Sequence, residues 1–127
     1  MNKYEEFIKT MKREHLNNAA VIDVLNIYVN GHNFLQRLED FNNKKGERRE
    51  YNGVIYSDEY EKDDESYFGQ NKVLFYSGDS DDDCDIVSYS ELYQYLRAAC
   101  KFYIEKNFEK KEIIEELLMK LKNTYAY

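Results

Sequence analysis

The chain has 127 residues and a formal net charge of -7, and hydrophobic residues make up 43% of it. This length fits a single domain over residues 1–127, and the hydrophobic content is sufficient for a packed core, which excludes disorder over most of the chain. The negative charge argues against a protein that binds a phosphate backbone, because such binding requires clustered Lys and Arg.

Cysteine usage and the N-terminal sequence indicate a cellular compartment. The two cysteines, Cys84 and Cys100, are too few for the disulfide framework of a small secreted domain, so both are expected to be reduced thiols. The N-terminus lacks the apolar segment of a signal peptide, and no run approaches the roughly 18 apolar residues of a membrane span. We therefore expect a cytoplasmic protein without membrane contact.

Apolar residues recur at helical spacing in the first third of the chain. They predict a short amphipathic helix over residues 4–13, a second helix that begins at Asn17 or Asn18 and ends at Asn30, and a third over residues 34–41. The Val and Ile content of the second segment would also permit a strand.

The middle of the chain changes character. Residues 51–56, 72–76 and 85–87 are short segments rich in β-branched and aromatic side chains, and Gly, Asn, Asp and Ser bound them. They predict strands of a small antiparallel sheet. The connections between them, residues 57–70 and 77–84, hold nearly all of the acidic excess of the chain.

The last third carries the clearest local signal. Ser88 and Glu91 have the spacing of a capping box, which predicts a helix that runs to about Lys106 and that is apolar nearly all round, as a buried central helix would be. Asn107 is predicted to cap a final helix with one apolar face. That face consists of Ile114, Leu117, Leu118, Leu121 and Tyr125. The predicted fold is therefore α+β, with N-terminal helices, a small antiparallel sheet and two C-terminal helices.

The negative charge is local. Residues 57–91 contain 12 Asp or Glu and 2 Lys, a balance of -10, whereas the rest of the chain has a balance of +3. The carboxylates form two blocks, residues 58–65 and 79–85, beside predicted strands and among aromatic residues. One face could present both blocks, and protein interfaces use aromatic anchors beside charge. The alternative is a solvated loop that improves solubility.

Part of the second block suggests calcium. Asp79, Asp81 and Asp83 alternate as in the opening of an EF-hand loop. However, Cys84 occupies the sixth loop position, where the turn needs Gly, and Ser90 occupies the twelfth, where Glu is expected. A solvated acidic turn therefore fits the segment better than a calcium site.

Other chemistry has little support in the sequence. His15 and His32 lack a Cys or His at metal-ligand spacing, and no phosphate-binding loop, nucleophile elbow or HExxH motif is present. We therefore expect no enzymatic activity, no cofactor and no metal.

The C-terminal half resembles a known family. Residues 73–76, the acidic turn, residues 86–96 and residues 99–107 are similar to the immunity proteins of bacterial contact-dependent growth inhibition (CDI) systems, in the group paired with ribonuclease toxins. The similarity covers roughly the last 60 residues.

The resemblance implies a cytoplasmic antitoxin that binds the C-terminal nuclease domain of an incoming effector, one to one, and covers its active site or RNA-binding face. A ribonuclease holds a polyanion and is therefore expected to be basic, so a carboxylate surface would compete with its substrate. We expect no direct contact with nucleic acid. Two alternatives stay open, a calcium-responsive or general regulatory module and an acidic mimic of nucleic acid.

Charge and aromatic placement, and not the resemblance, select the candidate contact residues. The side chains that we predict to contact the toxin are Asp58, Glu59, Tyr60, Glu61, Asp63, Asp64, Glu65 and Tyr67 in the first block, and Asp79, Asp81, Asp82, Asp83 and Asp85 in the second.

Overall fold

The computed structural model describes residues 2–126, which form five α-helices and four β-strands. The helices are α1 (Lys3–Arg13), α2 (Ala19–Val29), α3 (Phe34–Asn42), α4 (Tyr89–Lys106) and α5 (Lys111–Tyr125). The strands are β1 (Glu47–Arg48), β2 (Asn52–Tyr56), β3 (Lys72–Ser77) and β4 (Cys84–Ser88), and short 3-10 turns occupy Ser57–Glu59 and Phe108–Lys110. The α+β prediction is confirmed, with helices before and after the sheet.

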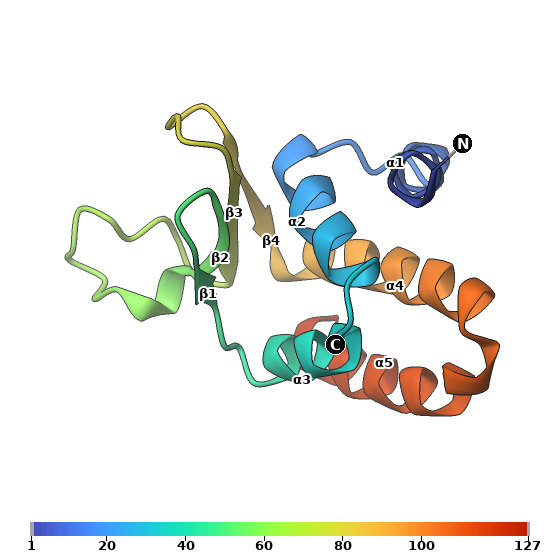
Figure 1. Cartoon of the computed structure of the whole chain (residues 1–127). Coiled ribbons are helices and arrows are strands. Elements are labelled where there is room, and N and C mark those ends of the chain that lie inside the picture. Colours follow the sequence, from blue (N-terminus) through green and yellow to red (C-terminus); the bar gives the residue numbers. More distant parts are fainter. Residues whose placement is uncertain (1, 127) are drawn as a thin grey trace.

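The strands form one antiparallel sheet in the order β1-β2-β3-β4. The helices lie on one side of this sheet, and residues 60–71 project from the other side (Figure 1). Three strands match the predicted segments closely. The two-residue strand β1 was not predicted, because it is too short to show alternation.

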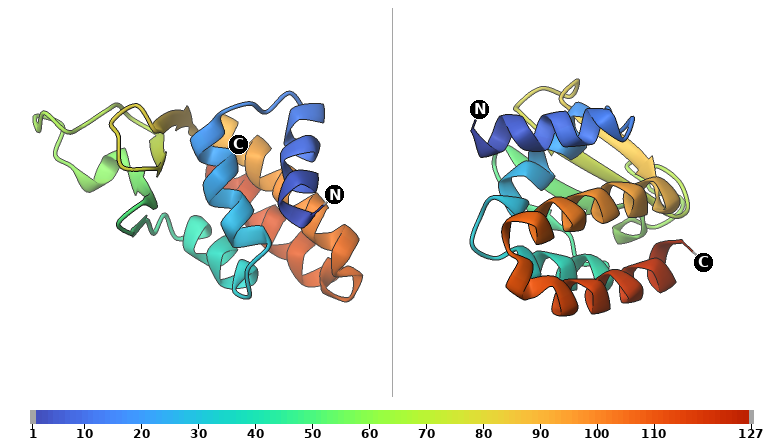
Figure 2. Two further views of the ribbon diagram at one scale, coloured as in Figure 1. Left: turned by 45° about the horizontal axis from the view of Figure 1, so that its top comes forward. Right: turned by 90° about the vertical axis from the view of Figure 1, so that its right-hand side faces the viewer.

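The two faces of the sheet differ in burial. The inner face, which the helices cover, carries the buried side chains of Val54, Tyr56, Val73, Phe75 and Val87. Successive side chains of a strand point to opposite faces, so the residues that alternate with these buried ones point to the outer face. The resulting helical layer is seen face on in the right-hand view of Figure 2, where α1, α4 and α5 run across the view one above another, in front of the sheet.

Helix α2 is a helix and not a strand, in spite of its Val and Ile residues. It packs against α1 and α4 and against strands β3 and β4, which buries most of its side chains. Asn18 is its N-cap residue, but the Asn18 side chain makes no capping hydrogen bond. Instead, the Ala20 N–H donates to Asp85 Oδ2 at 2.7 Å, so the cap comes from β4.

Helix α4 begins directly after β4 with the predicted capping box. The Glu91 N–H donates to Ser88 Oγ at 3.2 Å, and the Ser88 N–H donates to Glu91 Oε1 at 3.0 Å. The backbone and hydroxyl hydrogen bonds of Ser88 hold the pKa of Glu91 below its usual value. As predicted, α4 is central, because it packs against α1, α2 and α5.

Asn107 does not cap the last α-helix as predicted, although it is the N-cap residue of the 3-10 turn that leads into it, without a side-chain capping hydrogen bond. Asn107 follows the end of α4, and its side-chain amide donates back to the Tyr103 carbonyl at 3.1 Å. A 3-10 turn then intervenes, and Lys110 is the N-cap residue of α5. An Asn after a helix can satisfy the free carbonyls at its C-terminus, and here this competes with capping the next helix.

The predicted apolar face of α5 packs inward. Its buried residues are Ile114, Leu117, Leu121 and Tyr125, and Leu118 is half-buried. Near the end of the helix, the Tyr125 hydroxyl donates to the Phe41 carbonyl, and the Tyr56 hydroxyl donates to the Tyr125 hydroxyl at 2.5 Å. This buried cluster joins α5 to β2 and α3.

Candidate protein-binding surface

The two acidic blocks leave the sheet at opposite ends of β3. The first connection joins Tyr56 to Lys72, and the second joins Ser77 to Cys84. A strand of this length spans about 17 Å, so the blocks do not merge into one cluster. The first block projects from the sheet away from the helices (Figure 1; Figure 2, left). The second lies beside the N-terminus of α2, because Asp82 and Asp83 line one hollow with Ala19 and Asp23.

The first block is partly tied to the short strand β1. Arg48 forms an ion pair with Glu59 at 3.0 Å, and its guanidinium also donates to the Tyr60 hydroxyl at 3.3 Å. These hydrogen bonds raise the pKa of Arg48. Glu59 Oε2 accepts from the Tyr56 N–H at 2.8 Å, so Glu59 has a structural role beside any role in binding.

The rest of the first block faces solvent. Asp64 accepts from the Ser66 N–H at 2.7 Å and so stabilises its own turn. The half-buried Tyr67 donates its N–H to the Asp64 carbonyl at 3.0 Å. The remaining carboxylates are exposed and are those of Asp58, Glu61, Asp63 and Glu65.

The second block forms the tight turn between β3 and β4. Asp83 is folded back on this turn, since its Oδ2 accepts from the Ser80 N–H at 3.4 Å. A side chain at Gly78 would lie 2.3 Å from that same oxygen, and Gly78 has φ +129°, so the turn requires glycine there. Asp79, Asp81 and Asp82 are exposed.

Asp85 is set apart from the other acidic residues of its block. It pairs with Phe75 in β3, whose side chain is buried on the inner face, and it is half-buried under the N-terminus of α2. A carboxylate is favourable there because the first N–H groups of a helix carry partial positive charge. Its predicted role in toxin contact stays a prediction.

The outer face of the sheet carries residues that the sequence reasoning missed. Ile55, Leu74 and Ile86 are cross-strand neighbours on β2, β3 and β4, and Ile86 is 48% exposed. Apolar residues occupy both parities of these strands, so the sequence shows no hydrophobic period of two and does not reveal which set of side chains faces outward.

Cys84 borders this row at the start of β4. It pairs with Tyr76, is half-buried, and donates its thiol to the Asp81 carbonyl at 3.2 Å. Partial burial and the surrounding carboxylates raise the pKa of the Cys84 thiol. The thiol is therefore less readily ionised than an ordinary cysteine.

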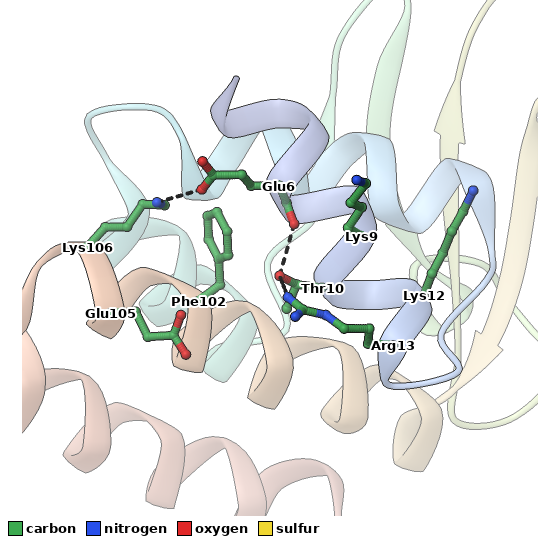
Figure 3. A pocket seen from close by; sticks show the side chains of 8 residues that line it. All are labelled: Glu6, Lys9, Thr10, Lys12, Arg13, Phe102, Glu105 and Lys106. Atoms are coloured by element: carbon green, nitrogen blue, oxygen red, sulfur yellow. Dashed lines mark hydrogen bonds and ion pairs between the residues drawn. The ribbon is translucent and has the colours of Figure 1, made fainter. Parts of the chain in front are cut away.

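A wide hollow lies elsewhere, between α1 and α4 on the helical side. It has a volume of about 620 Å³ and contains the side chains of four basic and two acidic residues, with Phe102 at its floor. Figure 3 shows Lys106 turned toward Glu6, and the two form an ion pair at 2.7 Å. The excess of positive charge makes this groove a poor match for a basic partner.

Two further kinds of feature were sought in the described residues, a metal-binding cluster and a membrane-spanning helix. Residues 2–126 contain no group of three or more His, Cys, Asp and Glu side chains that could hold a metal ion. None of the helices in this range combines the length and the apolar character that crossing a bilayer requires.

Comparison with known protein families identifies a relationship. A family model described as CDI immunity protein matches residues 18–118, which is most of the chain and includes the sheet, both acidic blocks and α4. No curated protein matches the chain.

Proposed function

Because this chain belongs to the family of CDI immunity proteins, we propose that it binds and neutralises a basic nuclease toxin, in particular a ribonuclease, through its two acidic loops. The family makes the chain an immunity protein whose partner is a cognate toxin. The proposal adds the chemistry of the toxin and the surface that meets it. We further propose that the complex contains one toxin per chain and forms in the cytoplasm.

One observation carries the proposal. All ten carboxylates predicted in residues 58–65 and 79–83 are exposed, and both loops lie on the sheet side of the molecule. A surface with this charge attracts a domain whose active site is built to hold RNA. If the loops cover that site or the RNA-binding face, the toxin cannot bind its substrate. Inhibition of this kind needs no catalysis by the immunity protein.

Two charge-removing variants test the proposal. The first replaces Asp79, Asp81 and Asp82 by Asn, and the second replaces Glu61 by Gln, Asp63 by Asn and Glu65 by Gln. Neither variant changes Glu59, Asp64 or Asp83, whose carboxylates accept hydrogen bonds from the backbone of the loops. The probe is the C-terminal toxin domain of a CDI effector that co-purifies with this chain, carrying a substitution that abolishes its catalytic activity.

Each variant should lower the association rate constant by about tenfold at low salt, with a smaller effect at high salt. A matched control replaces Glu39, Glu115 and Glu116, which are exposed on α3 and α5, by Gln. The control removes the same charge from the helical side and should change the rate less than about twofold. Equal rates for all variants would reject the acidic surface. If the unaltered toxin domain, without the inactivating substitution, shows no nuclease activity, the proposed chemistry is rejected.

A further inference from the structure

We infer that the outer face of the sheet is the apolar centre of the toxin interface, with Ile55, Leu74 and Ile86 as its anchoring side chains. This inference rests on the proposed function and adds to it the part of the surface that holds the toxin after capture. The three side chains form a row across β2, β3 and β4 between the acidic loops.

The row is continuous because its members are direct cross-strand neighbours. Leu74 pairs with Ile55 on one side and with Ile86 on the other. Opposite side chains in antiparallel strands lie about 5 Å apart, which is within contact distance. Ile86 is 48% exposed, and Ile55 and Leu74 are half-buried. Adjacent apolar side chains that reach the surface on one face of a sheet indicate a contact surface more than a single scattered one does.

Aromatic residues extend the apolar surface toward the second acidic loop. Tyr76 lies beside the row on the same face, with its ring over Gly53, where an added side chain would lie 2.5 Å from a ring carbon. The Arg49 N–H donates to the Tyr76 hydroxyl at 2.9 Å, which fixes the ring before any partner arrives. Tyr51, in the adjoining turn, is 56% exposed. Pre-ordered aromatic rings lose little conformational entropy on binding.

The arrangement of charge around the row identifies the occupant. The acidic loops lie at the two ends of β3, so the apolar row has a negatively charged rim on both sides. Protein interfaces commonly have an apolar centre and a polar rim, and this rim matches a basic partner. A second copy of this chain would bring like-charged loops together around the same face. The toxin is therefore the occupant that the charge favours.

The two parts of the surface would act at different stages of binding. Exposed carboxylates attract the toxin over several ångströms and raise the association rate constant. Apolar contacts form only in the docked complex, so they lower the dissociation rate constant. This division gives the inference a kinetic signature that the acidic loops alone would not produce.

The test is the variant Ile86→Thr, which keeps a β-branched residue in the strand and removes part of the apolar surface. Binding to the same catalytically inactivated toxin domain is measured by surface plasmon resonance. The dissociation rate constant should rise by about tenfold, with the association rate constant changed less than about twofold. Ile113→Thr on α5 is the matched control, because Ile113 is 49% exposed on the helical side. Thermal unfolding of both variants verifies that each is folded.

The outcomes separate this inference from the proposed function. If Ile86→Thr dissociates like the wild type while the acidic-loop variants associate slowly, the apolar centre is rejected and the acidic surface stands. If Ile86→Thr dissociates faster while the acidic-loop variants are unchanged, the outer face is supported without electrostatic steering. If Ile113→Thr has the larger effect, the interface lies on the helical side and both are rejected.

Discussion

Asp85 belongs by sequence to the acidic turn but by structure to the helical layer. Its carboxylate accepts the Ala20 N–H of α2 at 2.7 Å and is half-buried, whereas Asp81 and Asp82 in the turn before it are exposed. Asn18, the N-cap residue of α2, leaves this role unfilled. Asp85 therefore links the hairpin to the helices that cover the sheet.

Replacing Asp85 by Ala should lower the free energy of unfolding by about 1 kcal/mol, because the Ala20 N–H loses its acceptor and α2 loses a favourable charge. Urea unfolding followed by circular dichroism measures the change. Asp81→Ala, which removes an exposed carboxylate of the same turn, should stay within about 0.5 kcal/mol of the wild type. Equal stability of the two variants would mean that water replaces the carboxylate without cost.

Strand alternation could have predicted the position of Asp85. It is two residues before the buried Val87, so the two side chains point to the same face of β4. Composition instead grouped Asp85 with its acidic neighbours. The pairing of Glu59 and Tyr60 with Arg48 was beyond sequence reasoning, because it depends on β1, whose two residues carry no periodic signal.

The C-terminal helix α5 is joined to the sheet by the hydrogen-bonded phenols of Tyr56 and Tyr125 at the Phe41 carbonyl. Burial, with a smaller contribution from neighbouring phenols, raises the pKa of Tyr56 far above its ordinary value. Burial likewise raises the pKa of Tyr125 and, to about 12, that of Tyr28. The fold thus stabilises the neutral form of each of these tyrosines.

Because of this tyrosine cluster, we predict that the stability of the fold falls at alkaline pH. In the unfolded chain tyrosine has a pKa of about 10, below its values in the fold. The stabilisation is therefore complete below about pH 10 and is lost as pH rises toward the folded-state pKa values. Urea unfolding at increasing pH should show a falling free energy of unfolding above about pH 10. Tyr125→Phe should cost about 1–2 kcal/mol at neutral pH, because it leaves buried partners unsatisfied, and should lessen the alkaline loss.

Tyr51→Phe is the control for this prediction, because Tyr51 is exposed in the turn before β2. Its curve should follow that of the wild type at every pH. If Tyr125→Phe and Tyr51→Phe lose stability in parallel above pH 10, the buried cluster is not the source of the alkaline loss.

The helices and strands could be predicted where one local pattern dominated. The capping box of Ser88 and Glu91 marked the start of α4, and apolar spacing marked α1 and α5. The Val and Ile residues of α2 left helix and strand both open. Burial between the sheet and other helices decides that choice, and a local pattern does not contain this information. The role of Asn107 could not be predicted, because an Asn side chain can hydrogen-bond either to the last carbonyls of one helix or to the first N–H groups of the next.

Across the molecule as a whole, charge is divided between two sides. The acidic loops flank the outer face of the sheet, and the groove between α1 and α4 contains Lys9, Lys12 and Arg13 on the helical side. At physiological salt the electrostatic screening length is about 8 Å. Local charge, more than the net charge of -7, should therefore determine which partner approaches and from which side.

Replacing Lys9, Lys12 and Arg13 by Gln tests this division of charge. The variant is three charges more negative, yet its association rate constant for the toxin should change less than about twofold, because the substituted groove lies away from the acidic loops. Stopped-flow mixing at physiological salt measures the rate. A large acceleration, comparable in size to the slowing expected from the acidic-loop variants, would show that net charge steers the encounter.

The position of Cys84 provides an internal chemical probe of this surface. Cys100 is buried and burial raises its thiol pKa to about 12, so an alkylating reagent should modify Cys84 selectively in the folded protein. Modification should be slow at neutral pH, because the pKa of Cys84 is also raised. Since Cys84 borders the outer face, a docked toxin should slow its alkylation further, as mass spectrometry would show. The unmodified protein thus contains its own footprinting reporter, at a site that needs no engineered label.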